Sequence, residues 1–252
     1  MLYIGLVSIT FRNLSPKEIV KLVAKTGLDG IEWGGDVHVP PGEIEKAKEI
    51  KKITEDYGIK VSSYGSYYNV ENKDTDSFKD VLNTAIYLGA PIIRVWAGNK
   101  SSDQADKEYR NYIIKESRKI GEIAAKEGIT VAYEYHGGTL TDTNESTQRL
   151  LEEVSCDNIK SYWQPPVGNT FKYAMEGLEK ILPWLTNVHI FYWDKTGKRK
   201  TMSEGKNIIK RYLEKIKITG KNHFILIEFV KNDSEDIFLE DAKTLKEILS
   251  EL

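Results

Sequence analysis

Short runs rich in β-branched and aromatic residues recur along the whole 252-residue chain at intervals of 27 to 37 residues. Each interval is about the length of one strand followed by one helix. Eight such units of roughly 31 residues give a chain of the size typical of a (β/α)8 barrel. The runs begin at Tyr3, Gly30, Lys60, Ile92, Ile129, Ile159, Val188 and Phe224. The sequence therefore predicts an α/β fold, a single-domain (β/α)8 TIM barrel over residues 1–252.

The segments between the runs have the spacing and the end signals of amphipathic helices. Ser15-Pro16-Lys17-Glu18 combines an N-cap, a proline in the first turn and an early acid, and Gly27 follows as a stop signal. Further helices are expected over residues 41–57, 76–88, 109–126, 143–154, 173–185, 204–216 and 235–249. A doubly wound open sheet is the alternative. It is disfavoured because residues 8–13, after the first run, lack the glycine-rich phosphate fingerprint.

Composition narrows the class of partner. The chain has 36 basic and 38 acidic residues, so no net field favours nucleic acid. A single cysteine, Cys156, excludes an intrachain disulfide, which fits a reducing compartment. The first residues resemble a strand rather than a signal peptide, and no apolar run approaches the ~18 residues of a membrane span. We expect a soluble, cytoplasmic protein with no membrane partner.

Polar residues gather where the predicted strands end, which is where barrels of this kind carry their chemistry. Glu134, His189 and Glu228 each interrupt an apolar run, on the fifth, seventh and eighth strands. A lone buried carboxylate costs several kcal/mol unless it is paired or metal-bound. The alternative to a functional cluster is an ion pair inside the barrel, with Arg94 as partner. His223 begins the last strand and is expected on the opposite, structural face.

Two carboxylates and an imidazole suit a hard or borderline divalent ion such as Mn²⁺, Mg²⁺, Co²⁺ or Zn²⁺. Such an ion holds vicinal sugar oxygens and acidifies the C–H beside a carbonyl, while Glu134 and Glu228 move the proton as catalytic residues. His136, two residues after Glu134, is on the same face of the strand. It is a candidate for contacting substrate or for orienting Glu134.

Aromatic residues near the strand ends suit the C–H faces of a polyol, and a small sugar or sugar phosphate is the expected partner. The candidates for contacting substrate are Glu32, Trp33, His38, Tyr64, Trp96, His136, Trp163 and Trp193, and Tyr67 and Tyr68 add hydroxyls. The competing interpretation is that the tryptophans cap the barrel core. In that interpretation the Glu32–His38 loop is held by hydrogen bonds within the loop and does not contact substrate. The basic segment 194–200 either selects a phosphorylated or acidic sugar or is a solvated loop.

The order Glu134, His189, Glu228 on an eight-unit period resembles the xylose isomerase-like TIM barrels. The segments Gly30–Pro40 and Tyr133–Leu140 carry the closest likeness, to sugar phosphate isomerase/epimerase-like members. The resemblance implies a metal held by Glu, Asp, His and Glu from strands five to eight, with the two glutamates as the acid/base pair. It implies metal ligands at Glu134, Gln164, His189 and Glu228, and a homodimer or homotetramer.

Gln164 stands where that family has aspartate. An amide oxygen is a weaker donor than a carboxylate, and the site charge with a dication changes from −1 to 0. The ion is then bound loosely, is held in part by Asp194 or His136, or is absent in a protein that has lost its activity.

The leading hypothesis is a metal-assisted sugar or sugar-phosphate isomerase or epimerase that works through an enediolate. The alternatives are a keto-polyol dehydratase, similar to inosose dehydratases, and a sugar-binding barrel without catalysis. An endonuclease IV-like repair enzyme is disfavoured because it needs three zinc ions, and four histidines supply too few ligands. The balanced charge also lacks a basic face for DNA.

Overall fold

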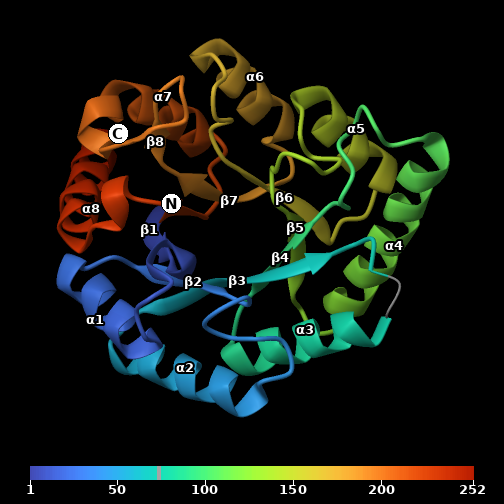
Figure 1. Cartoon of the computed structure of the whole chain (residues 1–252), viewed down its shortest axis with the longest axis horizontal. Coiled ribbons are helices and arrows are strands. Elements are labelled where there is room, and N and C mark those ends of the chain that lie inside the picture. Colours follow the sequence, from blue (N-terminus) through green and yellow to red (C-terminus); the bar gives the residue numbers. More distant parts are fainter. Residues whose placement is uncertain (73–74) are drawn as a thin grey trace.

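Eight parallel strands close into a barrel in the computed structural model, which describes residues 1–72 and 75–252 (Figure 1). Neighbouring strands follow the order β1-β10-β7-β6-β5-β4-β3-β2, which is chain order around the ring. The barrel strands are β1 Leu2–Val7, β2 Gly30–Gly34, β3 Lys60–Asn69, β4 Ile92–Trp96, β5 Thr130–Tyr133, β6 Ile159–Trp163, β7 Leu185–Ile190 and β10 His223–Ile227. The predicted (β/α)8 barrel is confirmed.

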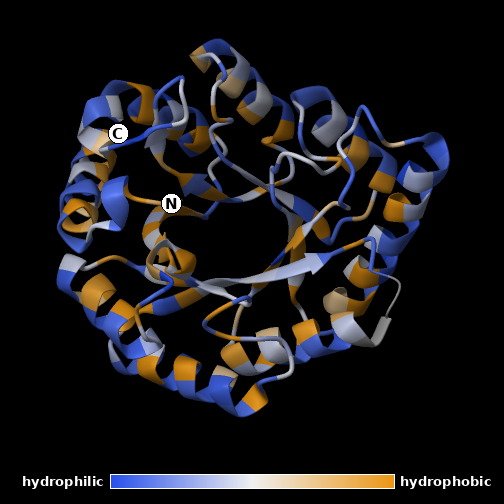
Figure 2. Ribbon diagram, in the orientation of Figure 1, coloured by the Kyte–Doolittle hydropathy of each residue, from blue (hydrophilic) through white to orange (hydrophobic). Residues whose placement is uncertain are grey.

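The helices form a ring outside the strands, and each carries both apolar and polar residues (Figure 2). They are α1 Pro16–Thr26, α2 Ile44–Asp56, α3 Thr75–Leu88, α4 Lys107–Ala125, α5 Asn144–Val154, α6 Phe171–Ile181, α7 Lys206–Lys217 and α8 Glu235–Ser250. Their apolar faces bury against the strands and form the main core. None of the described helices combines the length and the apolar character that crossing a bilayer requires.

The end signals read from the sequence act as expected at α1. Ser15 accepts a hydrogen bond from the Glu18 backbone, the Glu18 side chain accepts one from the Ser15 backbone, and Gly27 closes the helix in the left-handed region. Such caps satisfy backbone groups that have no partner within the helix.

Two helix boundaries differ from the prediction by more than two residues. The helix expected over 173–185 ends at Ile181, because Pro183 has no backbone N–H to continue it, and Leu185 instead begins β7. The second helix begins at Ile44 rather than at Pro41. The basic segment after β7, expected as a loop, is part of a small antiparallel hairpin of β8 Tyr192–Trp193 and β9 Arg199–Lys200.

The barrel places its polar residues at two ends. His223 opens β10, with Nδ1 2.6 Å from the Thr186 carbonyl and Nε2 2.8 Å from the Thr219 hydroxyl. It therefore belongs to the amino-terminal face, as predicted. The carboxyl ends of the strands and the loops that follow them form the opposite face, which we call the barrel mouth.

Candidate active site

Glu134, His189 and Glu228 meet at the barrel mouth. Each offers one ligand atom, and these atoms all lie within 4.8 Å of one another. Glu134 directly follows β5, His189 is in β7 and Glu228 directly follows β10. All three side chains are buried, at 5%, 0% and 5% exposure respectively. Residues far apart in sequence thus converge because parallel strands end at the same rim.

The two ring nitrogens of His189 face different groups. Nε2 lies 3.2 Å from Oε1 of Glu32, whereas Nδ1 lies 3.2 Å from Oε1 of Gln164 and 3.5 Å from Oε2 of Glu228. Burial opposes charging of this ring, but the carboxylates of Glu228 and Glu32 outweigh it and raise the pKa of His189. Of the two ring nitrogens, Nδ1 is the one that faces Gln164 and Glu228.

Arg94 is buried inside the barrel between two acids. Its Nε donates to Oε1 of Glu32 at 2.8 Å, and its Nη1 donates to Oε2 of Glu134. The Trp96 indole donates to the same Glu134 oxygen at 2.6 Å, and the Ser63 hydroxyl donates to Glu32 at 2.8 Å. Burial of Glu32 disfavours its charge, but His189 and Arg94 outweigh it and hold the pKa of Glu32 below its usual range. The ion pair with Arg94, considered as an alternative to a functional cluster, exists for Glu134.

A glycine makes room for this pairing. A Cβ atom on Gly65 of β3 would lie 2.7 Å from Nη2 of Arg94 and 2.9 Å from Oε1 of Glu32. Real side chains do not approach that closely, so with any other residue here the guanidinium or the Glu32 carboxylate would have to shift.

Glu228 has a different environment from Glu134. Among residues 1–72 and 75–252, its carboxylate has no cationic partner within 4 Å except the His189 ring. Burial, reinforced by the nearby charges of Glu134 and Glu32, raises the pKa of Glu228 to about 7. The next residue, Phe229, has φ of 54° and donates its N–H to the Thr10 hydroxyl at 3.2 Å. The turn that carries Glu228 is thus fixed to the short 3-10 turn Ser8–Phe11 that follows β1.

The donor atoms present fit a divalent cation. If Nε2 of His189 donates its hydrogen to Glu32, a neutral ring turns a lone pair on Nδ1 toward oxygens of Gln164, Glu228 and Glu134. Facing lone pairs repel unless a proton or a cation lies among them. Two carboxylates, an imidazole and an amide oxygen are a donor set for Mg²⁺, Mn²⁺, Co²⁺ or Zn²⁺. The other two candidates, Asp194 and His136, lie outside the group of three.

A cavity of about 290 Å³, which we call the mouth cavity, opens above this cluster. Trp96 packs against His136 at 5.1 Å between ring centroids, and the Tyr67 ring meets Trp96 edge-on at 5.4 Å. The lining residues are Ile9, Arg12, Tyr67, Arg94, Trp96, Glu134, His136, Gln164, Val167, Phe191, Trp193, Glu228 and Phe229. The mouth cavity thus joins the cluster to several predicted substrate-contact residues.

Five predicted contact residues lie elsewhere. The Tyr64 hydroxyl donates to the Val39 carbonyl at 2.8 Å, and the two nitrogens of His38 lie 2.9 Å from the Ser8 hydroxyl and 3.2 Å from the Leu14 carbonyl. The five are buried and do not line the mouth cavity: Glu32, Trp33, His38, Tyr64 and Trp163. Tyr68 packs on Phe78 of α3. Our proposal for substrate contacts therefore keeps Tyr67, Trp96, His136 and Trp193 from the predicted set.

Sequence reasoning missed five residues that line the mouth cavity, namely Ile9, Arg12, Val167, Phe191 and Phe229. Arg12 bonds to Asp36 and donates to the Tyr67 hydroxyl at 3.3 Å, and Phe191 and Phe229 supply apolar walls. Arg94 was considered only as an ion-pair partner. Its position in the middle of an apolar strand was the signal that it points into the barrel.

Comparison with known families identifies the fold group. The family model described as xylose isomerase-like TIM barrel matches residues 20–248. The chain belongs to this family. A curated relative is a 3-dehydroshikimate dehydratase of Bacillus anthracis, which is 24% identical over 96% of this chain and 95% of its own length.

Solved structures agree in fold. A probable 3-dehydroshikimate (3-DHS) dehydratase involved in petrobactin synthesis, also from Bacillus anthracis, matches with a TM-score of 0.82 and 21% identity, covering 98% of this chain and 99% of that one. A 3-keto-D-glucoside 4-epimerase of E. coli matches with a TM-score of 0.74 and 15% identity over 99% and 100% of the two chains. At these identities the likeness establishes the fold alone.

Proposed function

We propose that this member of the xylose isomerase-like family is a dehydratase of a small keto-polyol, with Glu228 as the base. The observation that carries the proposal is the unequal treatment of two converging carboxylates. Glu134 accepts hydrogen bonds from Arg94 and Trp96, whereas Glu228 faces the mouth cavity without a strong donor. Two donors hold the Glu134 carboxylate in place, whereas that of Glu228 is free to approach a substrate proton, so the two glutamates are suited to different tasks.

Glu134, Gln164, His189 and Glu228 are the residues that would hold a divalent cation. The cation, when bound, supplies Lewis acidity toward a substrate carbonyl. Glu32 fixes the His189 ring by facing Nε2, and Arg94 fixes Glu134, so that both ligands are held before substrate arrives.

The proton chemistry falls to Glu228. Its carboxylate removes the proton from the carbon beside the carbonyl, and the C–H electron pair becomes the C=C bond of an enolate. The enolate then re-forms the carbonyl and expels the β-hydroxyl group, which takes the proton back from Glu228 and leaves as water. Atoms and charge balance with one carboxylate acting first as base and then as acid.

A second candidate is the isomerase or epimerase that the sequence first suggested. It is favoured by one observation, that oxygens of Glu134 and Glu228 converge with His189 within 4.8 Å. In that reaction Glu134 delivers a proton to the opposite face of the same enolate. The solved epimerase of similar fold supports retaining this candidate.

Mass spectrometry of products separates the two candidates. The purified protein is incubated with 3-dehydroshikimate, related keto-polyols, ketoses, aldoses and their phosphates, each with Mg²⁺, Mn²⁺ or Co²⁺. A product lighter than its substrate by one water supports the dehydratase, and a product of unchanged mass supports the isomerase. Lack of turnover across the panel by protein shown to hold the cation would contradict both and favour a sugar-binding barrel.

A further inference from the structure

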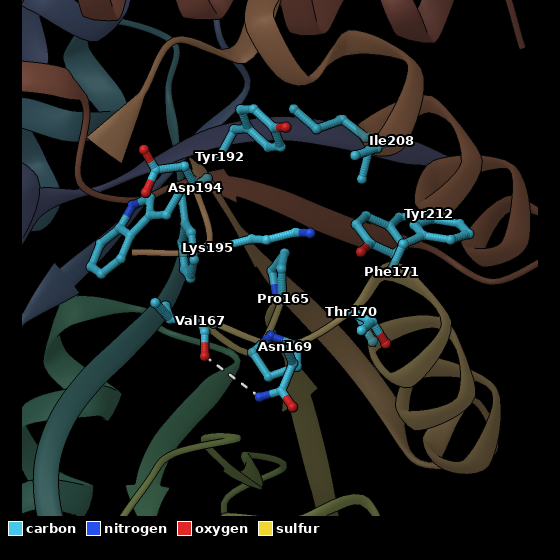
Figure 3. A pocket seen from close by; sticks show the side chains of 16 residues that line it. Pro165, Val167, Asn169, Thr170, Phe171, Tyr192, Asp194, Lys195, Ile208 and Tyr212 are labelled. Carbon is cyan, nitrogen blue, oxygen red and sulfur yellow. Dashed lines mark hydrogen bonds between the residues drawn. The ribbon is translucent and has the colours of Figure 1, made fainter. Parts of the chain in front are cut away.

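A second cavity lies beside the mouth cavity and has different chemistry. It has a volume of about 390 Å³ and lies between the loop after β6, the start of α6, the segment Phe191–Lys195 and the face of α7 (Figure 3). It shares Val167, Phe191 and Trp193 with the mouth cavity, so the two lie side by side. We call it the side pocket. Glu134, His189 and Glu228 do not line it.

The walls of the side pocket are largely aromatic. Phe171 and Tyr212 stack at 5.3 Å between ring centroids, and Phe191 packs on Trp193 at 4.9 Å. Gly205 at the start of α7 lets the Tyr192 ring approach, because a Cβ atom there would overlap that ring. Flat rings on facing walls favour a flat apolar group. The volume is more than twice the ~150 Å³ that accommodates benzene.

One cation reaches into this apolar space. Lys195 extends across the pocket toward Phe171 and Tyr212 (Figure 3). Within the part of the chain that the structure describes, no carboxylate lies within 4 Å of its ammonium group. Its neighbour Asp194 does not neutralise it, since Asp194 accepts hydrogen bonds from Thr196 at 2.6 Å and from the Lys198 backbone at 3.1 Å. Lys195 is exposed to solvent, and an anionic substituent on a bound ring would pair with its ammonium group.

We propose that the side pocket binds an anionic aryl group, and that one substrate spans both cavities with its polyol part over Glu228. The extension to a spanning substrate rests on the proposed function. The two cavities meet at Val167, Phe191 and Trp193, which is the boundary that a spanning substrate would cross.

Calorimetric titration with 2-naphthoate and 2-naphthamide tests the pocket without turnover. Ile208→Trp fills the pocket and should weaken naphthoate at least about tenfold, whereas Ile218→Trp, at a side chain 77% exposed just after α7, should not. Lys195→Gln should weaken naphthoate about three- to fivefold and leave naphthamide unchanged. Lys198→Gln is the matched control in the same loop.

Equal naphthoate affinity in wild type and Ile208→Trp, or no binding to wild type, would overturn the proposal that the side pocket binds an aryl group. This result would not depend on what the protein catalyses. The spanning substrate has its own test. With the substrate that the panel identifies, Ile208→Trp should raise KM for an aryl-bearing form and leave KM unchanged for the unsubstituted form. An equal change in both would overturn the span while leaving both the pocket and the proposed function standing.

Discussion

On the β4–β5 side of the barrel mouth, the carboxylate of Glu134 is fixed by Arg94 and Trp96. On the β10 side, the only cationic partner of Glu228 within 4 Å among the described residues is the His189 ring. Both carboxylates are 5% exposed. The difference between them is therefore their partners and not their access to water. A barrel that places like residues at equivalent strand ends can assign one to hold a ligand and the other to move a proton.

Breaking the paired side should have the largest effect on stability. Arg94→Met leaves Glu32 and Glu134 buried without their cation, and we expect a loss of about 3 to 5 kcal/mol in the free energy of unfolding. Urea denaturation measures it. Arg12→Met is the control, because the Arg12–Asp36 pair is partly exposed and should contribute about 1 kcal/mol or less. Similar losses in both variants would contradict the distinction.

Breaking the unpaired side should affect activity instead. Glu228→Gln removes the proposed base, and kcat should fall about 10²- to 10³-fold with the free energy of unfolding unchanged or raised. Steady-state kinetics and urea denaturation measure the two quantities. A variant that loses stability and keeps kcat would reverse the assignment.

A single added methyl group tests how closely Arg94 and Glu32 pack beside position 65. Gly65→Ala places a Cβ against Arg94 and Glu32, and we expect a loss of about 1 to 3 kcal/mol in stability. Gly137→Ala, where a Cβ meets nothing within 4 Å, is the control and should change little. Equal stabilities of the two variants would show that Arg94 has room to move.

The smallest effect should be on the pH dependence of stability in protein freed of metal. The pKa of Glu228 is about 7 in the folded chain against 4.5 ordinarily, so the folded state holds more protons between these values. Stability should therefore fall as pH rises from about 4.5 to 7, by roughly 1 kcal/mol per pH unit at most. The raised pKa of His189 acts in the same sense. Glu228→Gln should flatten this slope, and an unchanged slope would contradict the raised pKa.

The eight strands and the convergence of Glu134, His189 and Glu228 were predictable because period and strand ends are properties of the sequence. The five buried candidates for substrate contact show what the sequence did not predict, which is the direction in which each side chain points. Side chains alternate along a strand, so if Glu32 points into the barrel its neighbour Trp33 must point outward to the helices. The same alternation places Trp163 outward against Tyr212, while Tyr162 packs on His189 inside.

The partners of the acids were not predictable in the same way. Which carboxylate Arg94 meets depends on the tilt of β4 and on the space left by Gly65, and both arise only when the barrel closes. The β8–β9 hairpin likewise depends on pairing between Tyr192 and Lys200, which a run of basic residues does not signal.

The division of labour between Glu134 and Glu228 is tested most directly by deuterium exchange at the carbon beside the substrate carbonyl. NMR would follow the exchange in D₂O, with Mg²⁺ present and with the substrate that the panel identifies. Glu228→Gln should abolish exchange even at Mg²⁺ concentrations that saturate the site, whereas Glu134→Gln should regain exchange as the Mg²⁺ concentration is raised. Exchange at the wild-type rate in Glu228→Gln would contradict the account.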